Sequence, residues 1–415
     1  MNNRKYFIWI CLFFATLVSL IPTIFRFLNK NTSFPSDYSY YFLNKIGLLD
    51  SLWIKIIIIL LGLLSAYLFY KILLKTTNEK LAFYSLIFML ISSPFIFLIN
   101  TFSWHIVGFF LTVLGFFFLV NDRQIYAYVC FLGTLFLGTA SIACLLFLLC
   151  YSASLNKNKI FSIIFSILVI LNVWINKVEF VPNSFGTNFY VTEFGSIIGF
   201  GILFLIMGII GFILSWKFKF KFVFVYLCTL VFLLLSFKSI YSLIYLNVFL
   251  IVFFAYAFQK LVDRKWELTG IKNLFFVILL FTLLFSSISY GTTLSKSAPS
   301  LYMIDALNVL SQDEEGNILS HYSYKNIILY YSGKNEVNSD FVVSSEIDYL
   351  YGITNLKESQ KKFNEANIDY IFITDEMKHG LVWDYDDEGL LYLLPNKDFF
   401  SLKYSENGYE IWKVK

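Results

Sequence analysis

The chain has 415 residues, of which 58% are apolar, 20% are aromatic and only 14% are charged. Soluble domains carry roughly one-quarter charged residues, so this composition excludes a soluble globular protein and predicts a membrane protein. The net charge of +4 hides a division: residues 1–296 carry 22 Lys and Arg against 8 acids, and residues 297–415 carry 10 against 20. We therefore predict a basic multi-span domain over 1–296 and an acidic soluble domain over 297–415. The charge does not indicate nucleic-acid binding.

Nine apolar runs are long enough to cross a bilayer as helices. They lie at residues 6–28, 52–74, 81–100, 103–121, 159–175, 193–215, 221–237, 239–259 and 273–291. The first run follows a basic flank, as in a signal peptide, but it is about twenty residues long and lacks a small-residue cleavage site. We predict that it is an uncleaved first span.

The segment 124–153 is compatible with one long span or with two short helices broken at Gly138-Thr139. Short loops rich in Lys and Arg stay in the cytoplasm, which favours the fold-back. With a single crossing, nine cations in three later loops would face outward. The two-helix hairpin returns them to the side of the N-terminal Arg4-Lys5. We therefore predict a cytoplasmic N-terminus, about nine full spans plus a helical hairpin, and an extracytoplasmic C-terminal domain.

This topology brings three polar sites to the outer face: Asp37 in the loop 29–51, His105 at the end of "NTFSWH", and Glu193 at the end of a later loop. Taken alone, each is more often a solvated, capping or structural residue. Their convergence favours function, because ionisable groups in or near a membrane are costly. Two carboxylates and an imidazole predict an oxygen and nitrogen site for Mg²⁺ or Mn²⁺.

The order of these motifs resembles the GT-C membrane glycosyltransferases, and among them the single-subunit oligosaccharyltransferases of archaea and bacteria. In that family, acids in the first external loop, in a paired motif of the second and in a Thr- or Ser-led motif of a later loop hold the metal. Asp37 matches the first position. "SWH" matches the second, with His105 as a ligand and Ser103 where an acid is expected, and Glu193 in "YVTEFGS" matches the third.

The resemblance extends to two further segments. "HYSYK", beginning at His321, stands where the family carries a Trp-Trp-Asp-x-Gly motif that binds the acceptor sequon. This departure favours a different acceptor, such as a lipid-linked glycan. Lys238 stands where the family often places an Arg near the lipid phosphate, and it offers a point charge instead of a bidentate fork.

The C-terminal 119 residues have the pattern of a small α/β domain. Alternating apolar residues in "NILSH", "DFVVSS", "DYIFIT" and "YEIWKV" predict short strands, and residues 355–367 predict a solvated helix. His321 and His379 have no metal-ligand spacing, so both are read as structural.

The resemblance implies a membrane glycosyltransferase that moves a sugar or glycan from a polyprenyl-phosphate or -diphosphate donor to a glycan, lipid or protein acceptor outside the membrane. Asp37 would serve as base or metal ligand, Glu193 and His105 would help hold the ion, and Lys238 would contact the lipid phosphate. One alternative is a transporter, although the inverted repeats and mid-span charges it needs are not seen. The other is an inactive relative that acts as a scaffold in envelope glycan assembly.

Overall fold

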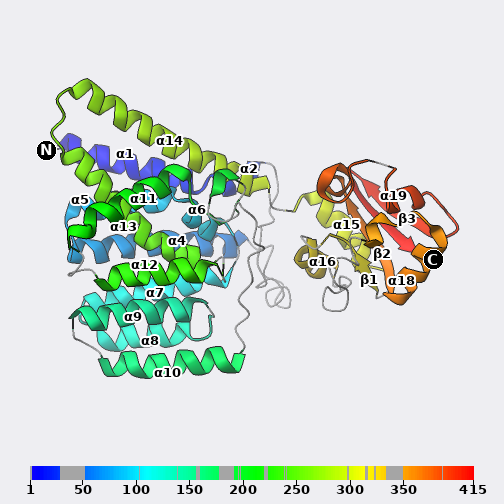
Figure 1. Ribbon diagram of the computed structural model, residues 1–415, viewed down its shortest axis with the longest axis horizontal. Coiled ribbons are helices and arrows are strands. Elements are labelled where there is room, and N and C mark those ends of the chain that lie inside the picture. Colours follow the sequence, from blue (N-terminus) through cyan, green and yellow to red (C-terminus); the bar gives the residue numbers. More distant parts are fainter. Residues whose placement is uncertain are drawn as a thin grey trace. The chain divides into compact units, whose positions relative to one another are not determined.

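A computed structural model of the chain divides into two compact units, with the boundary between residues 297 and 298. Each unit is taken by itself below (Figure 1). The structure describes residues 2–28, 52–101, 103–137, 139–155, 159–176, 191–194, 196, 198–218, 223–237, 239, 241–296, 299–313, 316–321, 324–332, 349–385 and 387–415.

The first unit is helical. Its elements are α1 (Asn2–Ser19), α2 (Ile21–Leu28), α4 (Leu52–Thr76), α5 (Glu79–Ile91), α6 (Ser93–Asn100), α7 (Trp104–Val120), α8 (Gln124–Thr134), α9 (Thr139–Leu155), α10 (Lys159–Asn176), η1 (Thr192–Phe194), α11 (Ile202–Ser215), η2 (Trp216–Phe218), α12 (Val223–Ser236), α13 (Ser242–Asp263) and α14 (Thr269–Lys296).

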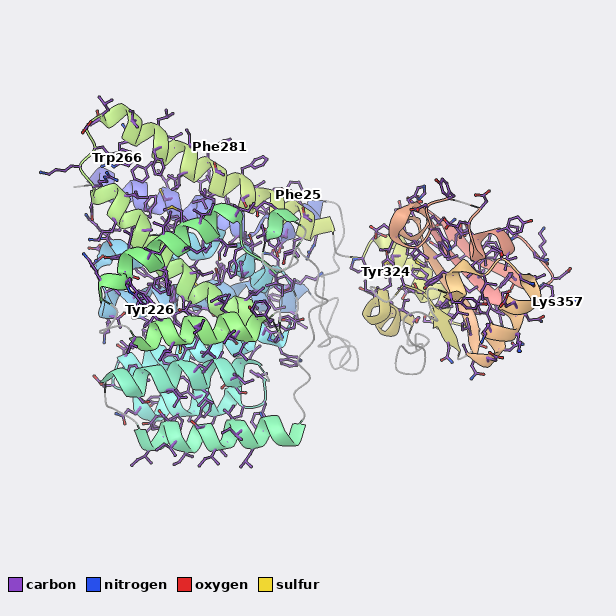
Figure 2. All side chains as sticks on the ribbon, viewed as in Figure 1. Phe25, Tyr226, Trp266, Phe281, Tyr324 and Lys357 are labelled. Carbon is purple, nitrogen blue, oxygen red and sulfur yellow. The ribbon has the colours of Figure 1, made fainter. Side chains whose placement is uncertain are left out.

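Helix α13 lies at the centre of this unit and packs against α5, α11 and α12 (Figure 1). Most of its residues are buried, including Phe254 and Ala257. The contact with α11 is especially close, because a Cβ at Gly211 would lie 1.8 Å from the carbonyl oxygen of Phe253. Small residues allow helices to approach this closely in membranes. Phe281 of α14, by contrast, is exposed (Figure 2).

Length and composition support fewer spans than predicted. Among the described residues three helices can cross a membrane, namely α4, α13 and α14, and the bent pair α5 and α6 makes a fourth if it is one span. Six other helices offer apolar stretches of only 10–17 residues among the described residues. The count of nine full spans is therefore not supported in the described part of the chain.

The run 81–100 shows why an apolar stretch need not form one straight helix. It bends by 60° between α5 and α6. Ser92 is extended there, with φ −74° and ψ 136°, and Pro94 follows in the first turn of α6. Proline has no backbone N–H to continue the α5 hydrogen-bond ladder and suits the first helical turn, so the sequence itself starts a new helix here.

The segment 124–153 forms two helices, α8 and α9, that pack against each other (Figure 1). This matches the hairpin interpretation instead of one long span. The side of the membrane on which each loop lies stays a prediction.

The second unit contains α15 (Leu301–Ser311), β1 (Asn317–Leu319), α16 (Lys325–Ser332), α18 (Leu356–Glu365), β2 (Ile368–Thr374), η4 (Met377–Leu381), α19 (Leu390–Leu393), β3 (Phe400–Glu406) and β4 (Tyr409–Val414). The four strands form one sheet in the order β1-β2-β4-β3. β1 runs parallel to β2, and the pairs β2–β4 and β3–β4 are antiparallel.

Three of the predicted strands correspond to β1, β2 and β4, and the predicted helix corresponds to α18. Asn355 caps that helix by accepting the backbone N–H of Lys357, whose side chain points to solvent (Figure 2). The opposite face of α18 buries Phe363 in the core. The predicted strand "DFVVSS" lies outside the described residues, and β3 was missed because only Phe400 on it is buried.

Substituting Gly211 tests the close approach of α11 to α13. We expect Gly211→Ala to lower the thermal midpoint of the detergent-solubilised chain, because the backbone of Phe253 cannot yield to a methyl group and overpacking costs about 1–3 kcal/mol. Gly270→Ala is the matched control, since a Cβ at Gly270 meets nothing within 4 Å. Equal midpoints for the two variants would refute the contact.

Candidate functional site

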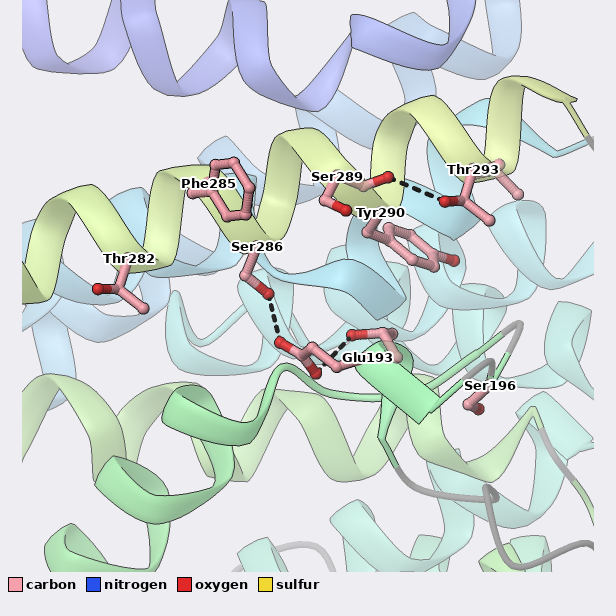
Figure 3. A pocket seen from close by; sticks show the side chains of 10 residues that line it. Glu193, Ser196, Thr282, Phe285, Ser286, Ser289, Tyr290 and Thr293 are labelled. Carbon is pink, nitrogen blue, oxygen red and sulfur yellow. Dashed lines mark hydrogen bonds between the residues drawn. The ribbon is translucent and has the colours of Figure 1, made fainter.

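A cavity of about 280 Å³ lies between η1 and the second half of α14, and we call it the α14 cavity (Figure 3). Its wall combines one carboxylate with many hydroxyl groups. The lining residues are Thr192, Glu193, Ser196, Thr282, Phe285, Ser286, Ser289, Tyr290, Thr293 and Leu294.

Glu193 joins two elements of this wall. One carboxylate oxygen, Oε1, accepts the hydroxyl of Ser286 on α14 at 2.7 Å. The other, Oε2, accepts the backbone N–H of Ile202 at 3.1 Å and the hydroxyl of Thr192 at 3.2 Å. Ile202 is the first residue of α11, so the carboxylate also caps that helix and complements its dipole. The residue is exposed, which leaves it accessible to a ligand.

The α14 side of the cavity is a hydroxyl face. Thr282, Ser286, Ser289 and Thr293 are spaced four, three and four residues apart, which places them on one side of a helix. Sequence reasoning missed this face, because it treated 273–291 only as an apolar span. The spacing of hydroxyl residues within that run was the signal available.

A buried arginine lies beside the C-terminal end of α14. Arg26 of α2 is only 3% exposed, and its guanidinium donates to the backbone carbonyls of Asn100 at 3.1 Å and Leu294 at 2.7 Å. The side-chain oxygen of Asn100 accepts the hydroxyl of Thr23 at 2.6 Å. Arg26 therefore ties the beginning of the "NTFSWH" turn to a residue that lines the cavity. The sequence signal that was overlooked is a charged arginine inside the apolar run 6–28.

The predicted site residues do not all lie in the α14 cavity. Glu193 lies in the α14 cavity. His105 lies in the first turn of α7, where its ring stacks on Tyr241 with centroids 3.7 Å apart, and it does not line that cavity. Asp37 and Lys238 lie outside the described residues. The structure thus places Glu193 in a cavity, without bringing His105 into the same one.

The fit to a metal ion depends on residues beyond this cavity. Within the described part of the chain, no three His, Cys, Asp or Glu side chains gather closely enough to hold an ion. A carboxylate has about four acceptor positions, and Glu193 uses three of them in protein hydrogen bonds. One position on Oε1 remains, so the described residues by themselves do not make a metal centre.

Of the segment "HYSYK", the structure describes His321, Tyr324 and Lys325, between β1 and the start of α16 in the second unit. The hydroxyl of Tyr324 donates to Glu376 at 2.7 Å and accepts the hydroxyl of Thr374 at 3.1 Å. Burial, together with the adjacent Glu376 carboxylate, raises the pKa of Tyr324 above its ordinary value. This phenol is therefore a neutral group held in place by a carboxylate at physiological pH.

Comparison with solved structures identifies the fold. The chain is similar to the crystal structure of the Archaeoglobus fulgidus oligosaccharyltransferase in its apo form, with 12% identity, a TM-score of 0.57, and coverage of 100% of this chain and 75% of that one. The same enzyme tethered to an acceptor peptide with an NVT sequon matches at 12% identity and a TM-score of 0.57, covering 99% and 74%. Its complex with Zn and sulfate matches at 14% identity and 0.51, covering 87% and 61%.

No protein-family model and no curated protein matches the sequence. The structural likeness nevertheless confirms the resemblance drawn from the motifs at the level of the fold. The chain has an oligosaccharyltransferase-like fold, with a membrane-helical part and a C-terminal globular domain.

Replacing Arg26 tests its role at the end of α14. We expect Arg26→Gln to lower the thermal midpoint of the purified chain, because a buried carbonyl left without its donor costs about 1–3 kcal/mol. Arg264→Gln removes an exposed arginine from the same unit and should leave the midpoint nearly unchanged. A shift of the same size in both variants would show that net charge, and not the two carbonyl contacts, is responsible.

Proposed function

We propose that this chain is an integral-membrane glycosyltransferase that moves a sugar or glycan from a polyprenyl-phosphate or -diphosphate donor to an acceptor at the outer face of the membrane. The observation that carries the proposal is the likeness to an oligosaccharyltransferase over 99% of this chain and 74% of that enzyme. The spanning helices supply the membrane setting that a lipid-linked donor requires.

The proposed chemistry is a displacement at the anomeric carbon. The acceptor hydroxyl or amide attacks that carbon, the bond to the donor phosphate breaks, and Asp37 takes the acceptor proton. Glu193 lies in the α14 cavity with one acceptor position open, which supports a role in orienting the acceptor. Lys238 is proposed to contact the departing phosphate, whose negative charge it would offset.

Binding of Mg²⁺ or Mn²⁺ remains part of the proposal through Asp37, His105 and Glu193. It requires Asp37 and His105 to approach Glu193, because the described residues hold no three-ligand group. In the archaeal enzyme, one crystal structure contains Zn and sulfate.

The acceptor is proposed to be a glycan, a lipid or a protein without the usual sequon. The archaeal enzyme was solved with a peptide that contains the NVT sequon. In this chain the segment "HYSYK" stands in place of the family's sequon-binding motif, and the hydroxyl of Tyr324 is already engaged by Glu376 and Thr374. These substitutions support an acceptor other than an Asn-x-Thr peptide.

The alternative of an inactive scaffold has one observation in its favour. Glu193 forms three hydrogen bonds that cap α11 and join it to α14, which is a complete structural role. A scaffold would keep those bonds and show no transfer.

A transfer assay separates the two functions. Membranes carrying the full chain are given a radiolabelled polyprenyl-linked sugar pool, and labelled product is counted for wild type, Asp37→Asn and Glu193→Gln. We expect at least a 100-fold loss in Asp37→Asn, because positioned acid–base groups contribute roughly 10²–10⁴-fold. We expect a loss in Glu193→Gln as well, although the amide oxygen can still cap α11.

Glu79→Ala is the control, since Glu79 is an exposed acid in the first turn of α5. It should transfer at the wild-type rate. Equal transfer by wild type, Asp37→Asn and Glu193→Gln would remove the proposed site, and no transfer by any of them would favour the scaffold.

A further inference from the structure

Positive charge gathers at the end of the membrane unit where α13 passes into α14 (Figure 2). Two contacts join other helix ends to this one. Lys75 of α4 donates to the side chain of Asn121, just after α7, at 2.6 Å. Lys80 of α5 pairs with Asp263 of α13 at 3.1 Å.

The ends of α4, α5, α7 and α13, the start of α14 and the residues next to them carry eight cations against four acids in the described part of the chain. The cations are Lys71, Lys75, Lys80, Arg123, Lys260, Arg264, Lys265 and Lys272, and the acids are Glu79, Asp122, Asp263 and Glu267. A surface with this excess attracts anions.

Two adjacent cations of the turn 264–268 are available to an anion. Arg264 and Lys265 are both exposed, and neither side chain makes a hydrogen bond or ion pair with another described residue. The neighbouring carboxylate of Asp263 is already engaged by Lys80. The positive charge of this pair is therefore not neutralised by the acid beside it.

The turn is held against both helices that it joins. The indole Nε1 of Trp266 donates to the carbonyl of Leu261 in α13 at 3.0 Å, and its ring lies 5.5 Å from that of Phe275 in α14. Lys272 donates to the carbonyl of Val262 at 2.8 Å. These bonds satisfy carbonyls in the last turn of α13. They also fix the turn that carries the two cations, which lowers the entropic cost of binding an anion there.

An apolar strip on α14 begins beside the cations. Ile271, Leu274, Ile278 and Phe281 are spaced three, four and three residues apart, which places them on one side of the helix. Each is between 54% and 70% exposed. The strip is about 15 Å long at about 1.5 Å for each residue. A cation pair, a tryptophan at the boundary and an apolar strip are the sequence of surfaces that a phospholipid meets from its headgroup to its acyl chain.

We propose that the α13–α14 turn is a binding site for an anionic phospholipid. Its phosphate and headgroup charge pair with Arg264 and Lys265, and one acyl chain lies along the strip from Ile271 to Phe281. A zwitterionic lipid would gain less, because its cationic headgroup competes with the two side chains for the phosphate. The predicted cytoplasmic position of this turn agrees with the proposal, since anionic lipids concentrate on that side. The site does not depend on the proposed transferase activity.

The test measures lipid binding directly. The full chain in a non-ionic detergent is titrated with phosphatidylglycerol or with phosphatidylcholine of the same acyl chains, and native mass spectrometry yields the Kd of the first bound lipid. We expect phosphatidylglycerol to bind at least fivefold more tightly. Its Kd should rise about fivefold in Arg264→Gln and in Lys265→Gln, because one cation near an anionic lipid contributes about that factor.

Arg123→Gln is the matched control. Arg123 is an exposed cation at the same end of the unit, but it precedes α8 and does not adjoin the α14 strip. Its Kd should stay within twofold of wild type. The exchanged pair Arg264→Lys with Lys265→Arg keeps both charges and should also bind within about threefold of wild type. Glycerol phosphate, a free phosphate without acyl chains, should not displace the bound lipid.

Three results would overturn the proposal. Equal affinity for the two lipids would show that charge is not recognised, and an Arg123→Gln effect as large as that of Arg264→Gln would show a diffuse attraction to the whole end. Displacement by glycerol phosphate would show a free-phosphate site. Since the readout is lipid binding, loss of transfer in the assay above leaves this site intact, and loss of this site leaves the transferase proposal intact.

Discussion

Hydrogen bonds in a low-dielectric setting hold the last helix of the membrane unit, and the candidate site depends on them. Ser286 of α14 bonds to Glu193, Ser287 bonds to the carbonyl of Ile91 at 2.6 Å, and the carbonyl of Leu294 accepts from Arg26. Apolar contacts alone have little preference between a neighbouring helix and lipid. These directional contacts therefore set where α14 lies, and with it one wall of the cavity.

The same contacts explain why Glu193 can be both structural and functional. Its carboxylate satisfies the exposed N–H at the start of α11 and meets α14 through Ser286, so the cavity wall forms where two helices are joined. Gly201 permits this geometry, since a Cβ there would lie 2.8 Å from the Ser286 hydroxyl. A ligand that bonds to the remaining acceptor position would approach a side chain already held in one orientation, which lowers the entropic cost of binding.

Secondary-structure elements were predicted correctly from the sequence where a single local signal marks their boundary. Gly138-Thr139 and the Lys and Arg distribution indicated the break between α8 and α9, and the cap at Asn355 marks the start of α18. The prediction of nine full spans was not supported in the described residues, because each continuous apolar run was assumed to form one straight helix. Pro94, for example, divides the run 81–100 into two helices. At the cavity, Glu193 had been singled out by its motif and its role stays a prediction, whereas the hydroxyl face of α14 and Arg26 were missed because they lie inside apolar runs.

Composition and charge by themselves determined that this is a membrane protein with an acidic C-terminal part, because burial in lipid demands apolar residues along a whole helix. Short motifs were enough to indicate the oligosaccharyltransferase-like fold. Only the tertiary structure decided that Glu193 faces the hydroxyls of α14 and that His105 stacks on Tyr241 outside that cavity. Contacts between residues ninety or more positions apart depend on how the helices pack, and the residue pattern within one helix does not specify which neighbours it meets.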